Sequence, residues 1–521
     1  ENHEVQPAPV AFAEKHFEAI KTRLVSSEAR VMTHSELERL LEVEGRELMR
    51  RLLDEHFSVR TQQEREFGVA GPVIGADGVV RTDLRDSERG LESVFGEVRL
   101  ERLAHHTPGT TGLRPLDAAL NLPKESFSLG VRRRAAEESA KSSFDEAVKS
   151  INTTTGATIS KRQLEELVVR AATDFDDFYE RRAALVPSVA AELSEILVLT
   201  TDGKGVVMRH SALREATRKA AERGAHKLKR RLSKGEKKDR KRMAQVAAVY
   251  TVAPFHRTPE DIVSELDRTD ETPKPRPRPE LKRVWASLKK EQAEVIREAF
   301  EEAARRDPER KKTWVALSDG DPDQLWLIEK LAAEYGVDIT IILDVIHVLE
   351  YLWKAAMAFN AESSPEAEAW VNERFLQILR GKASDVAAGI RRSATRRRLR
   401  GPKRKAADKC ANYLLNYAPY LHYDEYLAKG LPIATGVIEG ACRHLIKDRL
   451  DITGARWGLD GAEAVLRLRA LRSSGDFDEY WAFHERQELA RNHAQHYANG
   501  DIPALCQPAS PSGKPRLRLV K

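Results

Sequence analysis

The stretch EILVLTTDGKG, residues 195–205, decides the fold class because its mostly apolar run leads into an acidic residue, Asp202. Short apolar runs without alternation are typical of strands that helices cover on both faces of a sheet. Together with the helical segments between the runs, the pattern predicts an α/β fold. Two later runs have the same plan: TWVALSDG, residues 313–320, carries Asp319, and ITIILDVIHV, residues 339–348, carries Asp344.

The acids that follow these runs point to a metal site. Ligands of open α/β sheets collect at the carboxyl ends of the strands, and carboxylates gathered there repel one another unless a cation neutralises them. Hard carboxylate oxygens suit Mg²⁺ or Mn²⁺. Two such ions about 4 Å apart can activate an attacking oxygen and stabilise the leaving one in phosphodiester displacement. The pattern therefore predicts a nuclease or a polynucleotidyl transferase.

The same residues also have interpretations without a metal. Asp202-Gly203 lies between two β-prone runs, and Asp-Gly is a frequent hairpin turn. Asp344 could cap the helix that contains His347, and His347 could be a packed core histidine. The sequence alone leaves these alternatives open.

A further acid, Glu439, lies in the segment TGVIEGACRHLIKDR, residues 435–449. On an α-helix, a spacing of four residues brings Glu439, Arg443 and Lys447 to one face. One interpretation is an ordinary surface ion pair between Glu439 and Arg443. The other is a metal-holding glutamate beside cations that contact DNA, and spacing does not choose between the two.

The basic residues of the chain are concentrated in two blocks, although the 521 residues carry a formal net charge of only +6. Residues 218–242 hold 13 basic and 3 acidic residues, and residues 391–409 hold 10 basic residues and one acid. Because Lys and Arg neutralise phosphates, such blocks favour nucleic acid as the partner; solvated helix faces are the alternative. The candidate DNA contacts in the blocks are Lys227, Lys229, Arg230, Arg231, Arg396, Arg397 and Arg398.

The composition argues against several other classes of protein. Three cysteines without paired spacing exclude a disulfide scaffold and a CxxC zinc module, and they fit a reducing cytosol. No apolar run approaches the roughly 18–20 residues of a membrane span. The chain also opens without a charged-then-apolar leader. We therefore expect a cytoplasmic, nucleoid-associated protein with no membrane partner.

A pair of helices is predicted ahead of the first strand. A helix over 143–151 is followed by a glycine turn and a second helix over 160–172, which Ser160 can cap. This is the outline of a helix-turn-helix, whose second helix places its first residues in the major groove. Lys161 and Arg162 are therefore candidate DNA contacts.

These patterns divide the chain into seven segments. Within the α/β core we also expect a strand over 246–252 and a charged helix over 281–306. The segments are a helical region (1–67), a small β-rich segment of hairpins (68–125), the helix-turn-helix region (126–192), the first part of the core (193–350) with a basic insertion (209–243), an all-α segment (351–430), the second part of the core with the Glu439 helix (431–490) and a tail (491–521).

At these residues the chain resembles bacterial insertion-sequence transposases with an Asp-Asp-Glu (DDE) site, within them the Mutator-like group, and most closely the ISKra-type family. The resemblance covers roughly residues 90–485. Residues 122–179 are similar to that family's N-terminal DNA-binding region. The stretches that carry the likeness are TTDGKG (200–205), SDG (318–320), LDVIHV (343–348), the segment 436–449, GARW (454–457), GAEAVLRLR (461–469) and EYW (479–481).

The resemblance implies a ribonuclease-H-like catalytic core, interrupted by an all-α insertion and preceded by a mostly helical DNA-binding region. It implies Asp202, Asp319 and Glu439 as the catalytic, metal-holding acids, with two Mg²⁺ or Mn²⁺ ions as cofactors. Asp344 and His347 would then form a separate signature on the next strand. A count of strands from this sequence could instead place Asp344 in the metal site, which makes Asp344 the runner-up for the middle acid.

Enzymes of this family bind the ends of an insertion sequence in double-stranded DNA, cut there, and join the exposed 3′-hydroxyl to target DNA. We expect the same of this chain, acting as a homo-oligomer on DNA with Arg443 and Lys447 among its contacts. Two alternatives remain. The chain could be a ribonuclease-H-like DNA nuclease without strand transfer, or a domesticated DNA-binding protein without catalysis.

Overall fold

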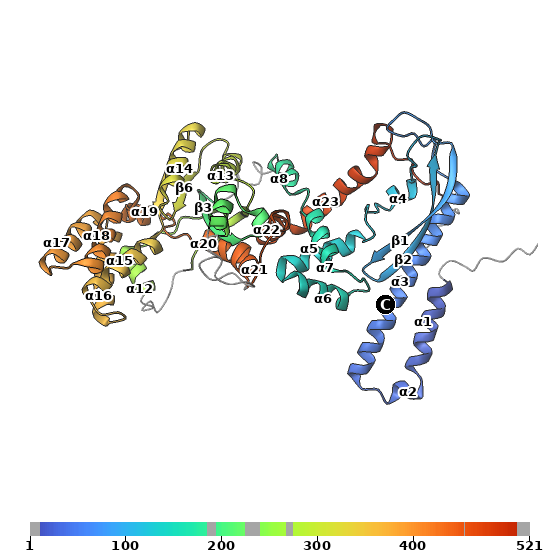
Figure 1. The fold of residues 1–521 in the computed structure, drawn as a ribbon, viewed down its shortest axis with the longest axis horizontal. Coiled ribbons are helices and arrows are strands. Elements are labelled where there is room, and N and C mark those ends of the chain that lie inside the picture. The colour runs from blue at the N-terminus through green and yellow to red at the C-terminus, as the bar shows by residue number, and fades with distance from the viewer. Residues whose placement is uncertain (1–10, 185–193, 224–239, 267–274, 453, 508–521) are drawn as a thin grey trace, which may run out of the picture. The chain divides into compact units, whose positions relative to one another are not determined.

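The computed structural model describes residues 11–184, 194–223, 240–266, 275–452 and 454–507 (Figure 1). The chain divides into two compact units. The terminal unit comprises residues 1–174 and 478–521, and the central unit comprises residues 175–477. Four candidate DNA contacts lie outside the described residues: Lys227, Lys229, Arg230 and Arg231.

The terminal unit begins with a long helical hairpin, seen at its blue end in Figure 1. The backbone amide of Phe12 donates to the Glu55 carboxylate at 2.7 Å, which fixes the first helix against the third. The third helix starts at a capping box of Thr33 and Glu36 and ends at Gly68, whose φ of 67° suits glycine. The helices are α1 (Ala11–Leu24), α2 (Ser27–Arg30) and α3 (His34–Phe67).

Strands β1 (Asp83–Ser93) and β2 (Gly96–His106) form one antiparallel hairpin. Val98 and Leu100 on β2 are buried and pack with Phe57 of α3, as expected of a sheet with one covered face. The sequence predicted several short hairpins here. A single long one forms instead, and buried positions alternate with more exposed ones on β2 from Gly96 to Ala104.

The remaining helices of the terminal unit include the predicted pair. The hydroxyl of Ser143 accepts the amide of Glu146, and the hydroxyl of Ser160 accepts the amide of Gln163, so both helices start at capping boxes. The structure therefore confirms both helices close to their predicted bounds. The helices are α4 (Pro115–Ala119), α5 (Leu129–Lys141), α6 (Phe144–Thr154), α7 (Lys161–Ala171) and α23 (Phe477–Asn492), the last from Asp478 onward.

The central unit is built on a five-stranded mixed sheet with the order β5-β4-β3-β6-β7. β3, β4 and β5 are antiparallel neighbours, whereas β3, β6 and β7 run parallel. The α/β fold with a mixed sheet is therefore confirmed. The strands are β3 (Ile196–Val207), β4 (Lys241–Val252), β5 (Glu280–Ser287), β6 (Thr313–Ser318) and β7 (Ile339–Leu343).

Two expectations about this sheet were wrong. Asp202-Gly203 is not a turn and does not end its strand, because Asp202 pairs with Val246 and Gly203 with Gln245 on β4. The charged helix predicted over 281–306 is instead a strand, β5, followed by a helix from Gln292. The run Val284-Trp285-Ala286 of β5 is buried against β4, so this segment forms a strand and the charged helix begins only after it.

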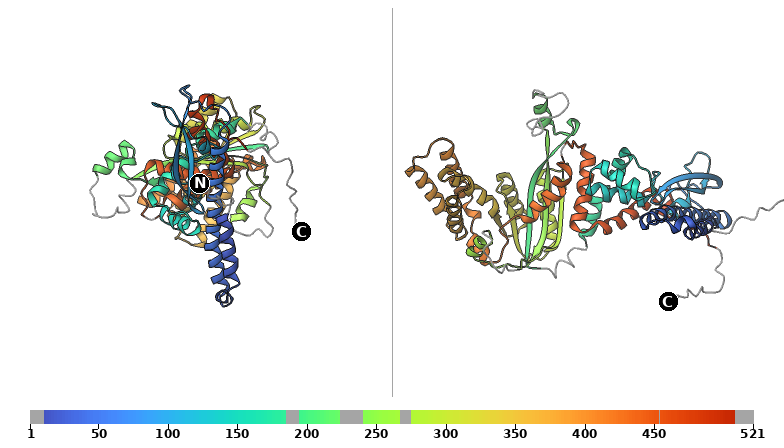
Figure 2. Two further views of the ribbon diagram at one scale, coloured as in Figure 1. Left: turned by 90° about the vertical axis from the view of Figure 1, so that its right-hand side faces the viewer. Right: turned by 90° about the horizontal axis from the view of Figure 1, so that it is seen from below.

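Helices surround this sheet, and those formed by residues 345–428 gather at one end of the unit (Figures 1 and 2). Buried residues from β3, β6 and β7 continue into these helices as one apolar core. The helices before β7 are α8 (Phe175–Ala183), η1 (His210–Ala212), α10 (Glu215–Arg223), α12 (Pro259–Leu266), α13 (Gln292–Arg306) and α14 (Pro322–Tyr335). Those after β7 are α15 (Val345–Phe359), α16 (Pro365–Leu379), α17 (Ala383–Arg396), α18 (Gly401–Asn416), η2 (Ala418–Tyr420) and α19 (Tyr423–Ala428).

The last part of the central unit carries Glu439 on an irregular helix. The segment 435–449, considered above as one α-helix, is α-helical at first, becomes a π-helix for six residues, and ends in one α-helical turn. Among the described residues, no helix is long and apolar enough to cross a membrane. The elements are α20 (Gly436–Ala441), the π-helix η3 (Cys442–Lys447), α21 (Asp448–Leu450) and α22 (Leu459–Ser474).

Candidate active site

The register of the sheet brings three aspartates to one level on neighbouring strands. The last parallel pair between β3 and β6 is Thr200 with Leu317, so Asp202 and Asp319 each lie two residues further on. The last pair between β6 and β7 is Ser318 with Leu343, and the next residues are Asp319 and Asp344. Hence the three aspartates sit side by side at the carboxyl ends of the parallel ladders, where ligands of such sheets bind.

Asp202 is half-buried and is held by two donors. Its Oδ1 accepts the amide of Gly203 at 2.6 Å, and its Oδ2 accepts the Sγ–H of Cys442 at 3.1 Å. Burial first, and then the charge of Asp202, raise the pKa of the Cys442 thiol, so the thiol stays protonated and donates. This contact links β3 to the helix of Glu439, and no strand–helix spacing in the sequence indicates it.

Asp319 is the first residue after β6 and is exposed. Its Oδ1 accepts the amide of Asp321 at 3.1 Å. Desolvation by the surrounding protein raises the pKa of Asp319 even though water reaches it, and the nearby charge of Asp202 raises it further, whereas His347 opposes this. Asp319 and Asp202 therefore repel each other across the two strands.

Asp344 is fully buried and caps α15, as one interpretation of the sequence expected. Its Oδ1 accepts the amide of Ile346 at 3.0 Å. Its Oδ2 accepts the hydroxyl of Thr435, the residue before α20. One turn along α15, His347 is half-buried. The capping role and a place in the site are compatible, because the cap fixes the carboxylate beside Glu439.

Glu439 is exposed on α20 and lies across from the aspartates. Desolvation, the charge of Asp344 and then that of Asp202 raise the pKa of Glu439, while His347 lowers it. One ligand atom each of Asp344, His347 and Glu439 lie within 4.8 Å of one another, close enough to share a metal ion. The sequence-predicted set of Asp202, Asp319 and Glu439 does not meet that distance criterion, although all three are described.

The donor set fits a divalent cation. Carboxylate oxygens suit Mg²⁺ and Mn²⁺, and the imidazole of His347 suits Mn²⁺ better than Mg²⁺. Among the described residues, no Lys or Arg forms an ion pair with these carboxylates; Arg443, expected beside Glu439, lies 3.8 Å from Asp448 instead. Within the described part of the chain, the acids Asp202, Asp319, Asp344 and Glu439 thus form a negative site with which no lysine or arginine forms an ion pair.

Because of the π-helix, Glu439 does not share one regular helix face with Arg443 and Lys447. A shared face for Glu439, Arg443 and Lys447 requires regular α-helix, but the chain is π-helical from Cys442 to Lys447. Arg443 and Lys447 are both exposed. Short π-helical insertions occur frequently at functional sites, which fits their position directly after Glu439.

The other candidate DNA contacts that the structure describes are exposed, and two of them have ion-pair partners. On α7, Lys161 pairs with Asp145 at 2.8 Å and Arg162 with Glu166 at 3.2 Å. Exposed ion pairs are weak, so phosphates can displace these partners. Arg396, Arg397 and Arg398 are exposed at the end of α17, and Arg397 donates to the Phe359 carbonyl at 2.9 Å.

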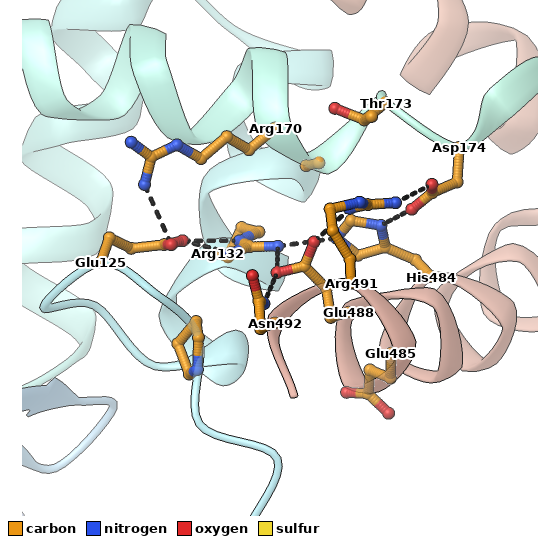
Figure 3. Close-up of polar contacts among 12 residues, drawn as sticks. Glu125, Arg132, Arg170, Thr173, Asp174, His484, Glu485, Glu488, Arg491 and Asn492 are labelled. Atoms are coloured by element: carbon orange, nitrogen blue, oxygen red, sulfur yellow. Dashed lines mark hydrogen bonds and ion pairs between the residues drawn. The ribbon is translucent and has the colours of Figure 1, made fainter. Parts of the chain in front are cut away.

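A second group of metal-ligand residues, which the sequence did not indicate, lies in the terminal unit (Figure 3). Asp174, His484 and Glu488 are all buried and meet the same distance criterion. His484 Nδ1 lies 2.6 Å from Asp174 and its Nε2 lies 2.9 Å from Arg132. Because Arg132 can only donate, Nε2 accepts and Nδ1 carries the proton that His484 shares with Asp174.

Arginines neutralise this second group. Glu488 lies 2.7 Å from Arg132 and also pairs with Arg491, which in turn pairs with Asp174. A cation entering here would meet two guanidinium groups. The group is therefore a buried ion-pair network that joins α5 to α23, and it is not a metal centre.

Comparison with known proteins adds no assignment. The chain matches no model of a protein family, and it has no match among curated proteins. The geometry and chemistry of the central site therefore carry the functional argument.

Proposed function

We propose that this protein is a DNA transposase that binds insertion-sequence ends and catalyses metal-dependent strand cleavage and strand transfer at a DDE site. The observation that carries the proposal is the row Asp202, Asp319 and Asp344 on three adjacent strands, with Glu439 facing it. An antiparallel β3-β4-β5 meander with two parallel strands added beside β3 supports a ribonuclease-H-like core. The helices α15–α19 between β7 and α20 support the all-α insertion before the last acid.

The residues of the central site fit Mg²⁺ or Mn²⁺. Asp202, Asp319 and Glu439 would hold the ions, and Asp344 with His347 completes the ring of donors around Glu439. When bound, two divalent ions supply activation of the attacking oxygen and stabilisation of the leaving oxygen in an in-line phosphodiester displacement. The acids relieve their mutual repulsion on binding cations, so the apo site is poised to take them up.

Protein groups around the acids keep the carboxylates in place. Cys442 holds Asp202, the amide of Asp321 holds Asp319, and Thr435 with the Ile346 amide holds Asp344. Gln324 of α14 donates to the Thr201 carbonyl at 3.0 Å and accepts the Ser318 hydroxyl at 2.5 Å, and it thereby ties β6 to β3. A scissile phosphate would bind against this rigid edge, with exposed Arg443 and Lys447 available for the flanking backbone.

DNA recognition is assigned to both units. The first residues of α7 would read base edges in the major groove, as the second helix of a helix-turn-helix does. The exposed Arg396, Arg397 and Arg398 would contact phosphates of end or target DNA. Such contacts make binding salt-dependent, whereas base readout makes it specific.

The test is cleavage and joining of labelled DNA. The substrate is duplex taken from the DNA that flanks this reading frame in its genome, incubated with the full chain, Mg²⁺ or Mn²⁺ and a target plasmid. We expect nicking at the element end and a joined product in the plasmid. Asp319→Asn should abolish both, while Asp321→Asn, which keeps the cap of α14, should leave both intact.

Other results would favour the alternatives. Metal-dependent cleavage without any joined product would identify a nuclease that shares the acids but lacks strand transfer. DNA binding that persists with no cleavage, and that is equal in the parent chain and in Asp202→Ala, would identify a non-catalytic DNA-binding protein.

A further inference from the structure

A cavity of about 570 Å³ in the terminal unit has no part in the proposed transposase site. It lies between the end of the β-hairpin, the segment leading through α4, and the residues that follow α23. Its volume is within the usual range of small-molecule sites, roughly 300–1,000 Å³. All of its lining residues are described and belong to one unit.

The lining carries an excess of positive charge. Arg89, Arg102, Arg114 and Lys124 all line the cavity, whereas Asp117 is its one carboxylate among the described lining residues. A fifth cation, Arg491, is already paired with Asp174 and Glu488. Asp117 is buried and pairs with Arg102 at 3.0 Å, so it neutralises one arginine and leaves the others in excess.

The three arginines differ in how many of their guanidinium N–H groups have hydrogen-bond partners. Arg89 donates to the carbonyls of Pro123 and Glu125, so the fold already uses it. Arg102 is 8% exposed, and its buried Nε has no hydrogen-bond partner among the described residues. Arg114 has a single long contact, from Nε to the Ser87 hydroxyl at 3.4 Å. The guanidinium of Arg114, which lines the cavity near Arg102, can therefore donate to an anion bound there.

We propose that this cavity binds the phosphate of a nucleotide, with Arg102 and Arg114 as phosphate ligands and Lys124 at the entrance. Planar guanidinium groups match phosphate oxygens in pairs, which explains why arginines are gathered here. The cavity exceeds the space of one phosphate, and Leu113, Leu122 and the ring of Tyr497 also line it. These apolar walls suit a sugar and a base, and they distinguish a nucleotide from inorganic phosphate.

Two sources could supply such a nucleotide, a free nucleoside monophosphate or a terminal nucleotide of a DNA strand. The experiment uses thymidine 5′-monophosphate, thymidine, and a 5′-phosphorylated oligothymidylate as probes of the full chain at constant ionic strength. Calorimetric titration gives the affinity, and thermal unfolding gives the stabilisation that binding to the native state requires. Thymidine lacks the phosphate and should not bind.

The decisive variant is Arg114→Gln, because Arg114 has no ion pair within the described residues whose loss would disturb the fold. We expect it to weaken binding of the monophosphate by about tenfold or more, the scale of one charge-assisted hydrogen bond. Lys124→Gln serves as a second variant at an exposed position and should weaken binding less. Arg85→Gln removes an exposed arginine of β1 that does not line the cavity, and it should bind like the parent chain.

The measured affinities distinguish a free nucleotide from the end of a DNA strand as the ligand. Equal affinity for monophosphate and oligonucleotide assigns a free nucleotide, and a stronger Arg114-dependent affinity for the oligonucleotide assigns a strand end. If neither probe binds in an Arg114-dependent way, or if thymidine binds as well as its monophosphate, the proposal is overturned. The cavity and the DDE acids can be tested separately, since Asp319→Asn should leave nucleotide binding unchanged.

Discussion

Two groups of acids with histidine lie in this protein, one in each unit, and both place three potential ligand atoms within 4.8 Å of one another. In the terminal unit, Asp174, His484 and Glu488 are all buried. In the central unit, Asp344 is buried, His347 is half-buried and Glu439 is exposed. Distances alone therefore do not tell a metal site from a structural one.

The two groups differ in the charges that surround them. The terminal group is enclosed by guanidinium groups, with Arg132 on Glu488 and Arg491 on both Glu488 and Asp174 (Figure 3). Burial raises the pKa of Glu488, but the charge and the hydrogen bond of Arg132, together with His484 and Asn492, leave that pKa below its ordinary value. Glu439 has the opposite shift, because burial and the charge of Asp344 both raise its pKa. Arginines therefore neutralise the terminal acids, whereas no lysine or arginine among the described residues pairs with the central acids.

The largest expected difference between the groups is in catalysis. Asp202→Ala removes a carboxylate of the central site, and we expect DNA cleavage to fall by about a thousandfold or more, as for groups that act as a unit. Asp174→Ala removes a carboxylate of the terminal group and should leave the cleavage rate of the folded fraction unchanged. Gel-based cleavage with each purified variant, normalised to the folded fraction by circular dichroism, measures this. An equal loss of DNA cleavage in the two variants would show that the two groups do not differ in catalysis.

The next prediction tests which residue of the central group, Asp319 or Asp344, is the middle catalytic acid. Asp319 is exposed and has one backbone donor, whereas Asp344 is fully buried and also caps α15. We therefore expect Asp319→Asn to abolish cleavage at unchanged stability. Asp344→Asn should lower stability by about 1 kcal/mol or more, since it disturbs a cap and a buried hydrogen bond. Paired cleavage and melting measurements decide, and our choice is wrong if only Asp344→Asn abolishes cleavage.

A stability experiment addresses the terminal group. Arg132→Met removes the buried guanidinium that Glu488 and Glu125 share, and it leaves them only the more exposed Arg491 and Arg170. Removing one partner of a buried pair costs about 3–5 kcal/mol, so we expect a large fall in the denaturation midpoint. The matched change in the central group, Glu439→Gln, should not lower stability at all. A small effect of Arg132→Met would show that the network is not the structural link between α5 and α23.

How far the sequence predicted these two groups depends on the kind of interaction. Asp202, Asp319 and Asp344 could be found because apolar runs lead into each of them along the chain. The contact of Cys442 with Asp202 spans 240 residues, and no sequence period indicates a contact at that separation. The terminal group was missed for the same reason, because His484 meets Asp174 across 310 residues.

Secondary structure shows the same limit. The helices capped by Ser143 and Ser160 were predicted because capping is local and readable from neighbouring residues. Strand β5 was predicted as helix, because its place beside β4 is decided by burial of Val284 and Trp285 in the finished sheet. Likewise, Asp202-Gly203 is a frequent turn pair whose extended conformation is imposed by pairing with β4.

Metal binding gives the next smaller effect. Mg²⁺ or Mn²⁺ that binds the native state should raise the unfolding free energy by about 1–3 kcal/mol when its concentration is 10–100 times the dissociation constant. Glu439→Gln should remove most of this stabilisation. Glu488→Gln, the matched change in the terminal group, should keep the full metal-dependent increment even though its baseline stability is lower. Differential scanning calorimetry with and without Mn²⁺ tests the pair, and a metal effect that depends on Glu488 would reverse our assignment.

The smallest effect is the pH dependence of the apo protein, and it should have opposite sign in the two groups. The lowered pKa of Glu488 means that its stabilisation is present above its unfolded value of about 4.5 and is lost as the pH falls below that value. The raised pKa of Glu439 means that its carboxylate destabilises the apo fold at neutral pH, and that this cost disappears as the pH falls through the raised value. Solvent screens the exposed Glu439, so its contribution is the smaller of the two.

Hydrogen exchange of the full chain can separate these contributions, because amides of α5 and α23 report on the terminal group and those of α15 and α20 on the central one. Without metal, acidification from neutral pH should weaken protection in α5 and α23, and Glu488→Gln should flatten that slope. In α15 and α20 the same acidification should not weaken protection until other groups titrate, and Glu439→Gln should raise protection at neutral pH. Slopes of the same sign in both regions would mean that repulsion among the central acids is already relieved by the protein itself, and the case for a cation there would fail.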